Sequence, residues 1–306
     1  MTTAVIAGAS GFIGSHFRRE LEARGWTVRT VGRTGDAIWG ETDAITAVLE
    51  DADLLLNLAG KSVSCRYTSR NKAEIVRSRE ATTAELGRAM AACKNPPRDW
   101  FNASTGTIYR HAEDGPQSEA DGELGSGFSV EVARGWEEAL KAAPTRGTRK
   151  IPLRMTIVLG PGGGVMPPLV ALARFGLGGR MGQGRQKFSW IHLEDLFRAV
   201  MFLHENPDIT GPVNLASPQA ADNDGLMAGV RSAVGAPFGL PTPAWLLTLG
   251  AVLIRTETEL VLKSRWVRPG KLKDAGFHWN HPELAEALVE SCRGAAVATE
   301  KHIERT

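Results

Sequence analysis

Three glycines near the N-terminus have the spacing of a dinucleotide-binding turn. Gly8, Gly11 and Gly14 separate an apolar, strand-like segment at residues 3–7 from a following segment in which apolar side chains recur at helical spacing. In a strand–turn–helix unit, such glycines allow the tight turn, the approach of a pyrophosphate to the backbone and the packing of helix on strand. We therefore expect the first N–H groups of the helix to bind a pyrophosphate, although a flexible glycine loop is the alternative. The residues assigned to this turn are Gly8, Ser10, Gly11, Phe12, Ile13 and Gly14.

The end of the second predicted strand indicates which nicotinamide cofactor is used. NAD-binding turns usually carry an acidic residue there, which accepts a hydrogen bond from the ribose 2′-hydroxyl. This chain has Gly32 and Arg33 at that place, and Asp36 follows several residues later. An arginine pairs well with a 2′-phosphate, so the sequence favours NADP(H) over NAD(H). The alternative is that Arg33 is an ordinary surface arginine.

An ordered set of short motifs spans nearly the whole chain. Together they resemble the atypical extended short-chain dehydrogenase/reductases, often labelled nucleoside-diphosphate-sugar epimerase-like, and in particular the SulA/YfcH-like group with a C-terminal helical domain. Each motif is weak alone, but their order along the chain is specific. They lie at residues 8–14, 57–60, 74–79, 160–164, 176–179, 184–186, 190–192 and 271–277.

This resemblance implies a Rossmann-type fold that binds NADP(H), with the substrate between the sheet and a smaller domain. It implies that residues of four segments face the cofactor: the glycine turn, the end of the central strand, the long helix after it, and the strand end near residue 159. Solvent-exposed positions on the helix are the alternative for its two charged residues. Beyond the turn, the positions implied are Gly32, Arg33, Leu58, Ala59, Gly60, Glu74, Arg79 and Leu159.

The usual acid–base pair of short-chain dehydrogenase/reductases, Tyr-x-x-x-Lys, is missing. The chain has two tyrosines; Tyr67 is followed four residues later by Asn71, and Tyr109 by Glu113. Ser104 resembles the serine that hydrogen-bonds a substrate oxygen, but a serine at a strand end also caps turns. Tyr109, with Arg110 or Arg79 as the neighbouring cation, is the leading substitute donor, and a tyrosine that only lines the pocket is equally compatible with the sequence.

A glycine-dense loop after residue 160 suggests where the substrate binds. Arg180 and Arg185 lie in this loop, and its backbone N–H groups could hold a diphosphate, although a mobile lid with solvated charges would look the same. We also assign Trp190 and His192 to the substrate side. The spacing His192-x-x-Asp195 is more typical of a capped helix start than of a metal site, so no metal is predicted.

The predicted elements alternate between strand and helix, which indicates an α/β fold built on a doubly wound parallel sheet. Strands are expected at 3–7, 26–31, 53–58, 100–103, 151–159, 188–192 and 213–216, and helices at 13–24, 73–93, 129–143 and 193–205. We divide the chain into a nucleotide-binding domain at 1–221, to whose substrate cleft 160–192 contributes, a small helical domain at 222–293 and a tail at 294–306.

Composition narrows the class of protein. A net charge of +2 with 23% charged residues gives no indication of a nucleic-acid-binding surface. The most apolar run, 245–254, is shorter than the roughly 20 residues that span a bilayer, so no membrane association is predicted. The three cysteines are widely spaced and odd in number, which fits a reducing, cytoplasmic location.

Two functions remain open from the sequence. The first is an NADP(H)-dependent oxidoreductase or nucleotide-sugar epimerase-like enzyme, acting on a phosphorylated or nucleotide-linked small molecule. The second is a non-catalytic NADP(H)-binding protein, regulatory or redox-sensing, which the missing Tyr-x-x-x-Lys pair permits. The sequence does not indicate an oligomeric state.

Overall fold

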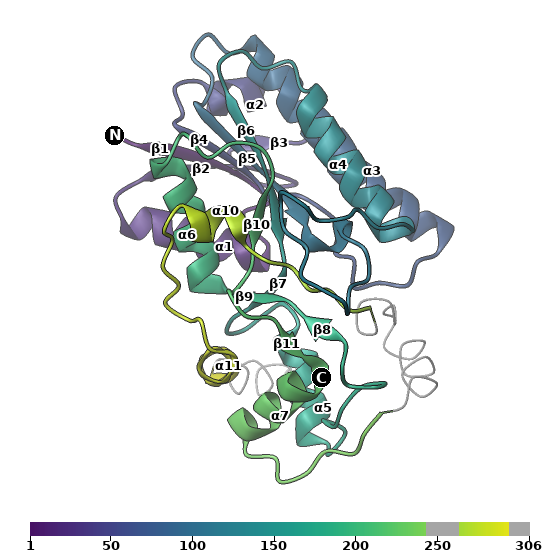
Figure 1. Cartoon of the computed structure of the whole chain (residues 1–306). Helices are drawn as coiled ribbons and strands as arrows, with labels where there is room; N and C mark the ends of the chain where they lie inside the picture. Colours follow the sequence, from purple (N-terminus) through teal and green to yellow (C-terminus); the bar gives the residue numbers. More distant parts are fainter. Residues whose placement is uncertain (243–262, 294–306) are drawn as a thin grey trace.

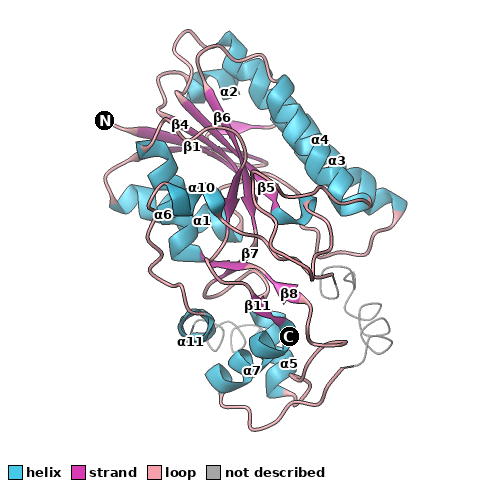
Figure 2. Cartoon of the chain, in the orientation of Figure 1, coloured by secondary structure: helices cyan, strands magenta, loops and turns pink. Residues whose placement is uncertain are grey.

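A seven-stranded parallel sheet forms the centre of the computed structural model, which describes residues 1–242 and 263–293 (Figures 1 and 2). The strand order is β10-β6-β5-β4-β1-β2-β3, and every neighbouring pair is parallel. The order reverses between β1 and β4, which is where ligands bind in sheets of this kind. The strands are β1 Thr3–Ala7, β2 Thr27–Gly32, β3 Ala37–Ile38, β4 Leu54–Asn57, β5 Asp99–Thr105, β6 Arg149–Met155 and β10 Val213–Leu215.

Helices cover both faces of this sheet, as the buried strands require. Alternate side chains of β1 enter two different cores: Ile6 packs with α1 and α6, and Val5 packs with α2, α3 and α4. Figure 1 shows these two helix layers on opposite sides of the sheet. The predicted doubly wound Rossmann-type fold is therefore confirmed. The helices are α1 Phe12–Ala23, α2 Thr42–Leu49, α3 Ser69–Ala92, α4 Phe128–Ala142 and α6 Leu193–Glu205.

A smaller lobe lies below the carboxyl edge of the sheet in Figure 1. Its core is formed by α5 (Met166–Arg174), α7 (Asn223–Val234) and α11 (Leu284–Arg293), where Val170, Val230 and Leu288 are buried together. Two small sheets join this lobe to the rest: β7 (Ile157–Leu159) with β9 (Trp190–His192), and β8 (Lys187–Phe188) with β11 (Ala221–Asp222).

The single strand predicted at 151–159 is wrong in one respect. The chain leaves the central sheet at Thr156, whose backbone N and Oγ1 both donate to the Leu215 carbonyl, at 3.0 and 2.9 Å. Residues 157–159 then pair with β9 in a separate sheet. This break turns the chain from the central sheet toward the smaller lobe.

Part of the segment predicted as a helical C-terminal domain packs on the central sheet instead. Helix α10 (Gly270–Asp274) contributes Leu272, and Phe277 follows, to the core that contains α1 and α6. Helices α2 and α5 were not predicted. The apolar run at 245–254 and the tail at 294–306 lie outside the described residues. Within the described ranges, no helix is both long and apolar enough to cross a membrane.

Candidate active site

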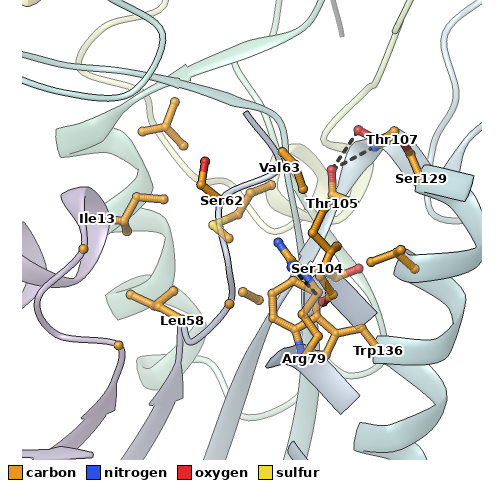
Figure 3. Close-up of a pocket in the computed structure, with 18 of the residues that line it drawn as sticks. Ile13, Leu58, Ser62, Val63, Arg79, Ser104, Thr105, Thr107, Ser129 and Trp136 are labelled. Carbon is orange, nitrogen blue, oxygen red and sulfur yellow. Dashed lines mark hydrogen bonds between the residues drawn. The ribbon is translucent and has the colours of Figure 1, made fainter. Parts of the chain in front are cut away.

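A cavity of about 420 Å³ opens at the carboxyl edge of the sheet, beside the point where the strand order reverses (Figure 3). It runs from the glycine turn after β1, past the loop after β4 and one side of α3, to the end of β5 and the first turn of α4. Met155, Thr156 and Val158, at the end of β6 and after it, also line the cavity, so six separate segments of the chain meet there. The location is the one expected for a dinucleotide and its substrate in a doubly wound sheet.

The glycine turn has the geometry that its sequence predicts. Gly8 has a φ of +85°, and a Cβ there would lie 2.9 Å from the backbone of Leu58 and Ala59 on β4's side. A Cβ on Gly14 would overlap the Gly8 carbonyl, so the close approach of helix to strand requires glycine. Gly11 has more room, with its nearest neighbour at 3.5 Å. All the assigned turn residues except Ser10, which is exposed, line the cavity: Gly8, Gly11, Phe12, Ile13 and Gly14.

The end of β2 lies outside this cavity lining. Arg33 is exposed and follows Gly32 directly. The Asp36 carboxylate accepts from the Thr30 hydroxyl at 2.8 Å and from the Thr30 backbone N–H at 2.7 Å. The side-chain hydrogen bond from Thr30 is the main reason that the pKa of Asp36 is lowered. Asp36 is thus engaged within its own turn, while Arg33 is accessible.

The segment after β4 contributes Leu58 and Gly60 to the cavity, but not every residue expected there. Ala59 is buried behind the lining, and its backbone N–H donates to the side chain of Asn57 at 3.1 Å. Glu74 is not among the lining residues; it forms an ion pair with Arg77, 2.9 Å away on the outer side of α3.

Arg79, from α3, places a mostly buried cation in the cavity wall. Its Nη1 donates to two backbone carbonyls, those of Lys61 and Ile75, each at 3.1 Å. The guanidinium lies 4.9 Å from the centre of the Trp136 ring. In the described part of the chain, no carboxylate lies within ion-pair distance of it, and burial lowers the pKa of Arg79 to about 10. A buried cation without a counter-ion favours the binding or formation of an anion next to it.

Ser104 lines the cavity, but its hydroxyl is used by a buried ion pair. Ser104 Oγ donates to Glu137 Oε1 at 2.6 Å. Glu137 also accepts two hydrogen bonds from Arg154, each of 2.8 Å, in a bidentate pair. These hydrogen bonds fix the Ser104 hydroxyl in one orientation. They are as compatible with a structural role for Ser104 as with the binding of a substrate oxygen.

The next residue, Thr105, offers a hydroxyl to the cavity that the sequence analysis missed. Its Oγ1 donates to the Thr107 hydroxyl at 2.9 Å and accepts from the Thr107 backbone N–H at 3.1 Å (Figure 3). Ser129, at the start of α4, also lines the cavity, and its buried Oγ has no hydrogen-bond partner among the residues that the structure describes. Both Ser104 and Thr105 line the cavity, and the sequence could not show that the Ser104 hydroxyl is engaged by Glu137 on α4 while the Thr105 hydroxyl bonds to Thr107 in the next turn.

The structure does not bring Tyr109 to the cavity. Its side chain is 1% exposed, and its hydroxyl donates to Asn214 Oδ1 and accepts from Arg154 Nη1, both at 2.9 Å. The neighbouring cation is Arg154, not Arg110 or Arg79 as expected. Burial raises the pKa of Tyr109. Because the 3₁₀ turn at 106–108 carries Tyr109 beneath the sheet edge, this phenol links two buried elements and lies away from the ligand.

The other tyrosine does line the cavity. Tyr67 belongs to the loop between β4 and α3, and its ring packs edge-on against Phe128, with 4.9 Å between ring centres. Phe128 is the first residue of α4. No motif in the sequence indicates this placement, because Tyr67 is far along the chain from the strand end that carries Ser104.

The remaining predicted positions lie away from this cavity. Leu159 and Trp190 are buried in the core of the smaller lobe, and Val158 lines the cavity in place of Leu159. Arg180 and Arg185 are exposed, and neither belongs to the lining. The glycine-dense loop therefore presents these arginines to solvent in this conformation.

His192 is part of a cluster that the sequence did not reveal. His192, Glu194, His281 and Glu290 bring their side-chain ligand atoms within 4.8 Å of one another. His281 pairs with Glu194 at 3.0 Å, and burial, together with the charge of His281, lowers the pKa of His192. His192 Nδ1 accepts from the Glu194 N–H at 3.4 Å, and His281 Nδ1 lies 3.5 Å from a carboxylate oxygen of Glu290. The cluster thus joins α6 to α11.

Comparison with known proteins gives matches over nearly the whole chain. The sequence profile "NAD dependent epimerase/dehydratase family" matches residues 4–216, and "Domain of unknown function (DUF1731)" matches residues 242–290. The Mycobacterium tuberculosis "Epimerase family protein MT2273" is 34% identical over 298 residues, which cover 92% of this chain and 95% of that protein. The human "Epimerase family protein SDR39U1" is 31% identical over 299 residues, covering 94% and 98%.

Solved structures are also similar to this chain over nearly its whole length. The crystal structure of human SDR39U1 with NADPH superposes with a TM-score of 0.86 and 29% identity, covering 95% of this chain and 99% of that one. A nucleoside-diphosphate sugar epimerase from Corynebacterium glutamicum shares the fold, with a TM-score of 0.76 and 23% identity, covering 99% of this chain and 66% of that one.

Proposed function

Because this chain belongs to the NAD-dependent epimerase/dehydratase family, we propose that it binds NADP(H) and acts as an oxidoreductase or epimerase-like enzyme. Its substrate is a hydroxyl or carbonyl compound of a phosphorylated or nucleotide-linked kind. The observation that carries this proposal is a single cavity that extends from the glycine turn to the hydroxyls of Thr105 and Thr107. The structure of human SDR39U1 with NADPH supports the choice of cofactor.

The residues of the turn fit a dinucleotide. The Gly11 position leaves the path to the helix start open, and the first turn of α1 carries no acidic side chain that would repel a pyrophosphate. At the end of β2, the Asp36 carboxylate is engaged by Thr30 and Arg33 is exposed. This arrangement suits a 2′-phosphate better than a free 2′-hydroxyl.

The far end of the cavity holds the polar groups that would handle the substrate. When bound, the nicotinamide supplies or accepts a hydride. Thr105, Thr107 and Ser129 provide hydroxyls that can orient a substrate oxygen, and Arg79 provides a positive charge. Apolar side chains around them, such as Val158 and Val132, limit the access of water to the reacting carbon.

The test is cofactor binding followed by turnover. Trp136 lies in the cavity wall, so quenching of its fluorescence should report NADPH binding. Nucleotide sugars and phosphorylated aldehydes or ketones form the first panel, with loss of reduced nicotinamide or change of sugar configuration as readouts. Turnover of a panel member supports the enzyme. Tight NADPH binding with no turnover would instead support the non-catalytic NADP(H)-binding protein, whose basis is that α4 carries no tyrosine and the chain has no Tyr-x-x-x-Lys pair.

A further inference from the structure

We propose that Tyr67 and Arg79 form the acid–base pair of this site. The proposal rests on the function proposed above, and it assigns the proton donor that α4 does not supply. Both side chains line the same cavity as the glycine turn and Thr105. They come from the loop after β4 and from α3, so the pair is built from a different part of the chain than a Tyr-x-x-x-Lys on one helix.

Hydrogen bonds to α3 hold the loop that carries Tyr67. Thr68 caps α3 by accepting from the Asn71 N–H at 3.2 Å, and Asn71 Nδ2 donates to the Arg66 carbonyl at 2.7 Å. These contacts fix the residues on both sides of Tyr67. The ring then packs edge-on against Phe128, at an angle of 69°. The ring of Tyr67 therefore lies beside the first residue of α4.

Arg79 supplies the positive charge that a tyrosine acid requires. A cation close to a phenol stabilises the phenolate, which brings proton transfer nearer to neutral pH. Arg79 and Tyr67 line the same cavity, and a Tyr67 phenolate there acts to raise the pKa of Arg79 against the larger lowering caused by burial. The side chain of Arg79 is held in place by Trp136 and by the Lys61 carbonyl, so its orientation is fixed before ligands bind.

Tyr67 transfers a proton while the bound cofactor exchanges a hydride with the substrate. In the reducing direction, bound NADPH would supply the hydride for the new C–H bond and be oxidised to NADP⁺. The electron pair of the C=O bond moves to oxygen, which takes the proton of the Tyr67 hydroxyl. The phenolate remains beside Arg79 and regains a proton from water. In the oxidising direction, Tyr67 phenolate accepts the hydroxyl proton of the substrate.

The experiment uses the fact that the chain has only two tyrosines. Labelling tyrosine at Cζ gives two ¹³C NMR signals, each of which shifts when its phenol ionises. The Tyr109→Phe protein assigns the remaining signal to Tyr67. Replacing the cation, as Arg79→Gln, should raise the midpoint of the Tyr67 titration by about one pH unit, and Arg79→Lys should restore most of that shift.

A matched control is Arg77→Gln, since Arg77 lies on the same helix but pairs with Glu74 outside the cavity. It should leave the Tyr67 midpoint unchanged. Circular dichroism and an unaltered Tyr109 signal check that each variant is folded. An equal midpoint in wild type and in folded Arg79→Gln would overturn the pairing.

A second measurement places the pair next to the reacting end of the cofactor. NADP⁺ and NADPH differ in the charge of the nicotinamide ring, so the Tyr67 midpoint of the wild-type protein should be lower with NADP⁺ than with NADPH. The Tyr109 midpoint should be the same with both. Equal Tyr67 midpoints under saturation would refute the catalytic assignment. Failure of both nucleotides to bind would refute the proposed function instead, and the Arg79 titration would still decide the pairing.

Discussion

Replacing Tyr109 with phenylalanine should destabilise the protein without affecting its cofactor site. The hydroxyl of Tyr109 donates to Asn214 and accepts from Arg154, both at 2.9 Å, and all three residues are buried. Phenylalanine fills the same space but leaves the Asn214 oxygen and one Arg154 N–H without a partner. The effect should therefore appear in the free energy of unfolding and not in ligand binding.

The magnitude follows from the two groups left unsatisfied. A buried donor or acceptor that loses its partner costs about 1–3 kcal/mol, and more if it is charged. Arg154 keeps its two hydrogen bonds to Glu137, so the free-energy cost of losing the Tyr109 hydroxyl is smaller at Arg154 than for a fully unpaired cation. We expect Tyr109→Phe to lower the free energy of unfolding by about 2–4 kcal/mol. Tyr67 is only partly buried, so Tyr67→Phe should cost less than about 1 kcal/mol and serves as the matched control.

Urea unfolding of wild type and both variants measures this difference as a change in midpoint at constant slope. Titration with NADPH, followed by tryptophan fluorescence, should give the same affinity for all three proteins. With a substrate that the wild type converts, Tyr109→Phe should have the wild-type turnover rate at urea concentrations below its unfolding transition. Wild-type stability combined with a large loss of turnover in Tyr109→Phe would show that Tyr109 is the proton donor after all.

Three further substitutions test the cofactor and substrate assignments. Arg33→Ala should weaken NADPH binding by about 1.5–3 kcal/mol in calorimetry and leave NADH binding unchanged; equal losses would move Arg33 away from the 2′-phosphate. Gly11→Val should abolish binding of both nucleotides while the circular dichroism spectrum stays native, whereas Gly14→Ala should reduce stability, because its Cβ would overlap the Gly8 carbonyl. Arg185→Ala should leave NADPH affinity unchanged, since Arg185 is exposed and outside the cavity lining; reduced affinity would place it on the cofactor side.

The fold could be predicted because local signals agreed with one another. Apolar strands alternate with amphipathic helices, and the glycine turn joins the first strand and helix at the point where ligands bind in such sheets. The turn residues Gly8, Gly11 and Gly14 could be assigned from spacing alone, because their roles depend on backbone geometry. The break at Thr156 could not be predicted, since a tertiary contact with Leu215 produces it.

The reacting end of the site was harder to predict, because it depends on side-chain direction. Ser104 and Thr105 are adjacent and chemically similar, and both line the cavity, but the Ser104 hydroxyl is engaged by Glu137 on α4, a tertiary contact that sequence spacing does not show. Tyr109 lies close in sequence to that strand end but is buried, while Tyr67 reaches the cavity from a loop about 40 residues earlier in the chain.

The central claim, an NADP(H) site in the cavity beside the glycine turn, is tested most directly by calorimetric titration of the wild-type protein with NADPH and with NADH. The account predicts saturable binding of one NADPH per chain, with weaker binding of NADH, because Arg33 is accessible and Asp36 is engaged by Thr30. Equal affinity for the two nucleotides, or no binding of either, would contradict it.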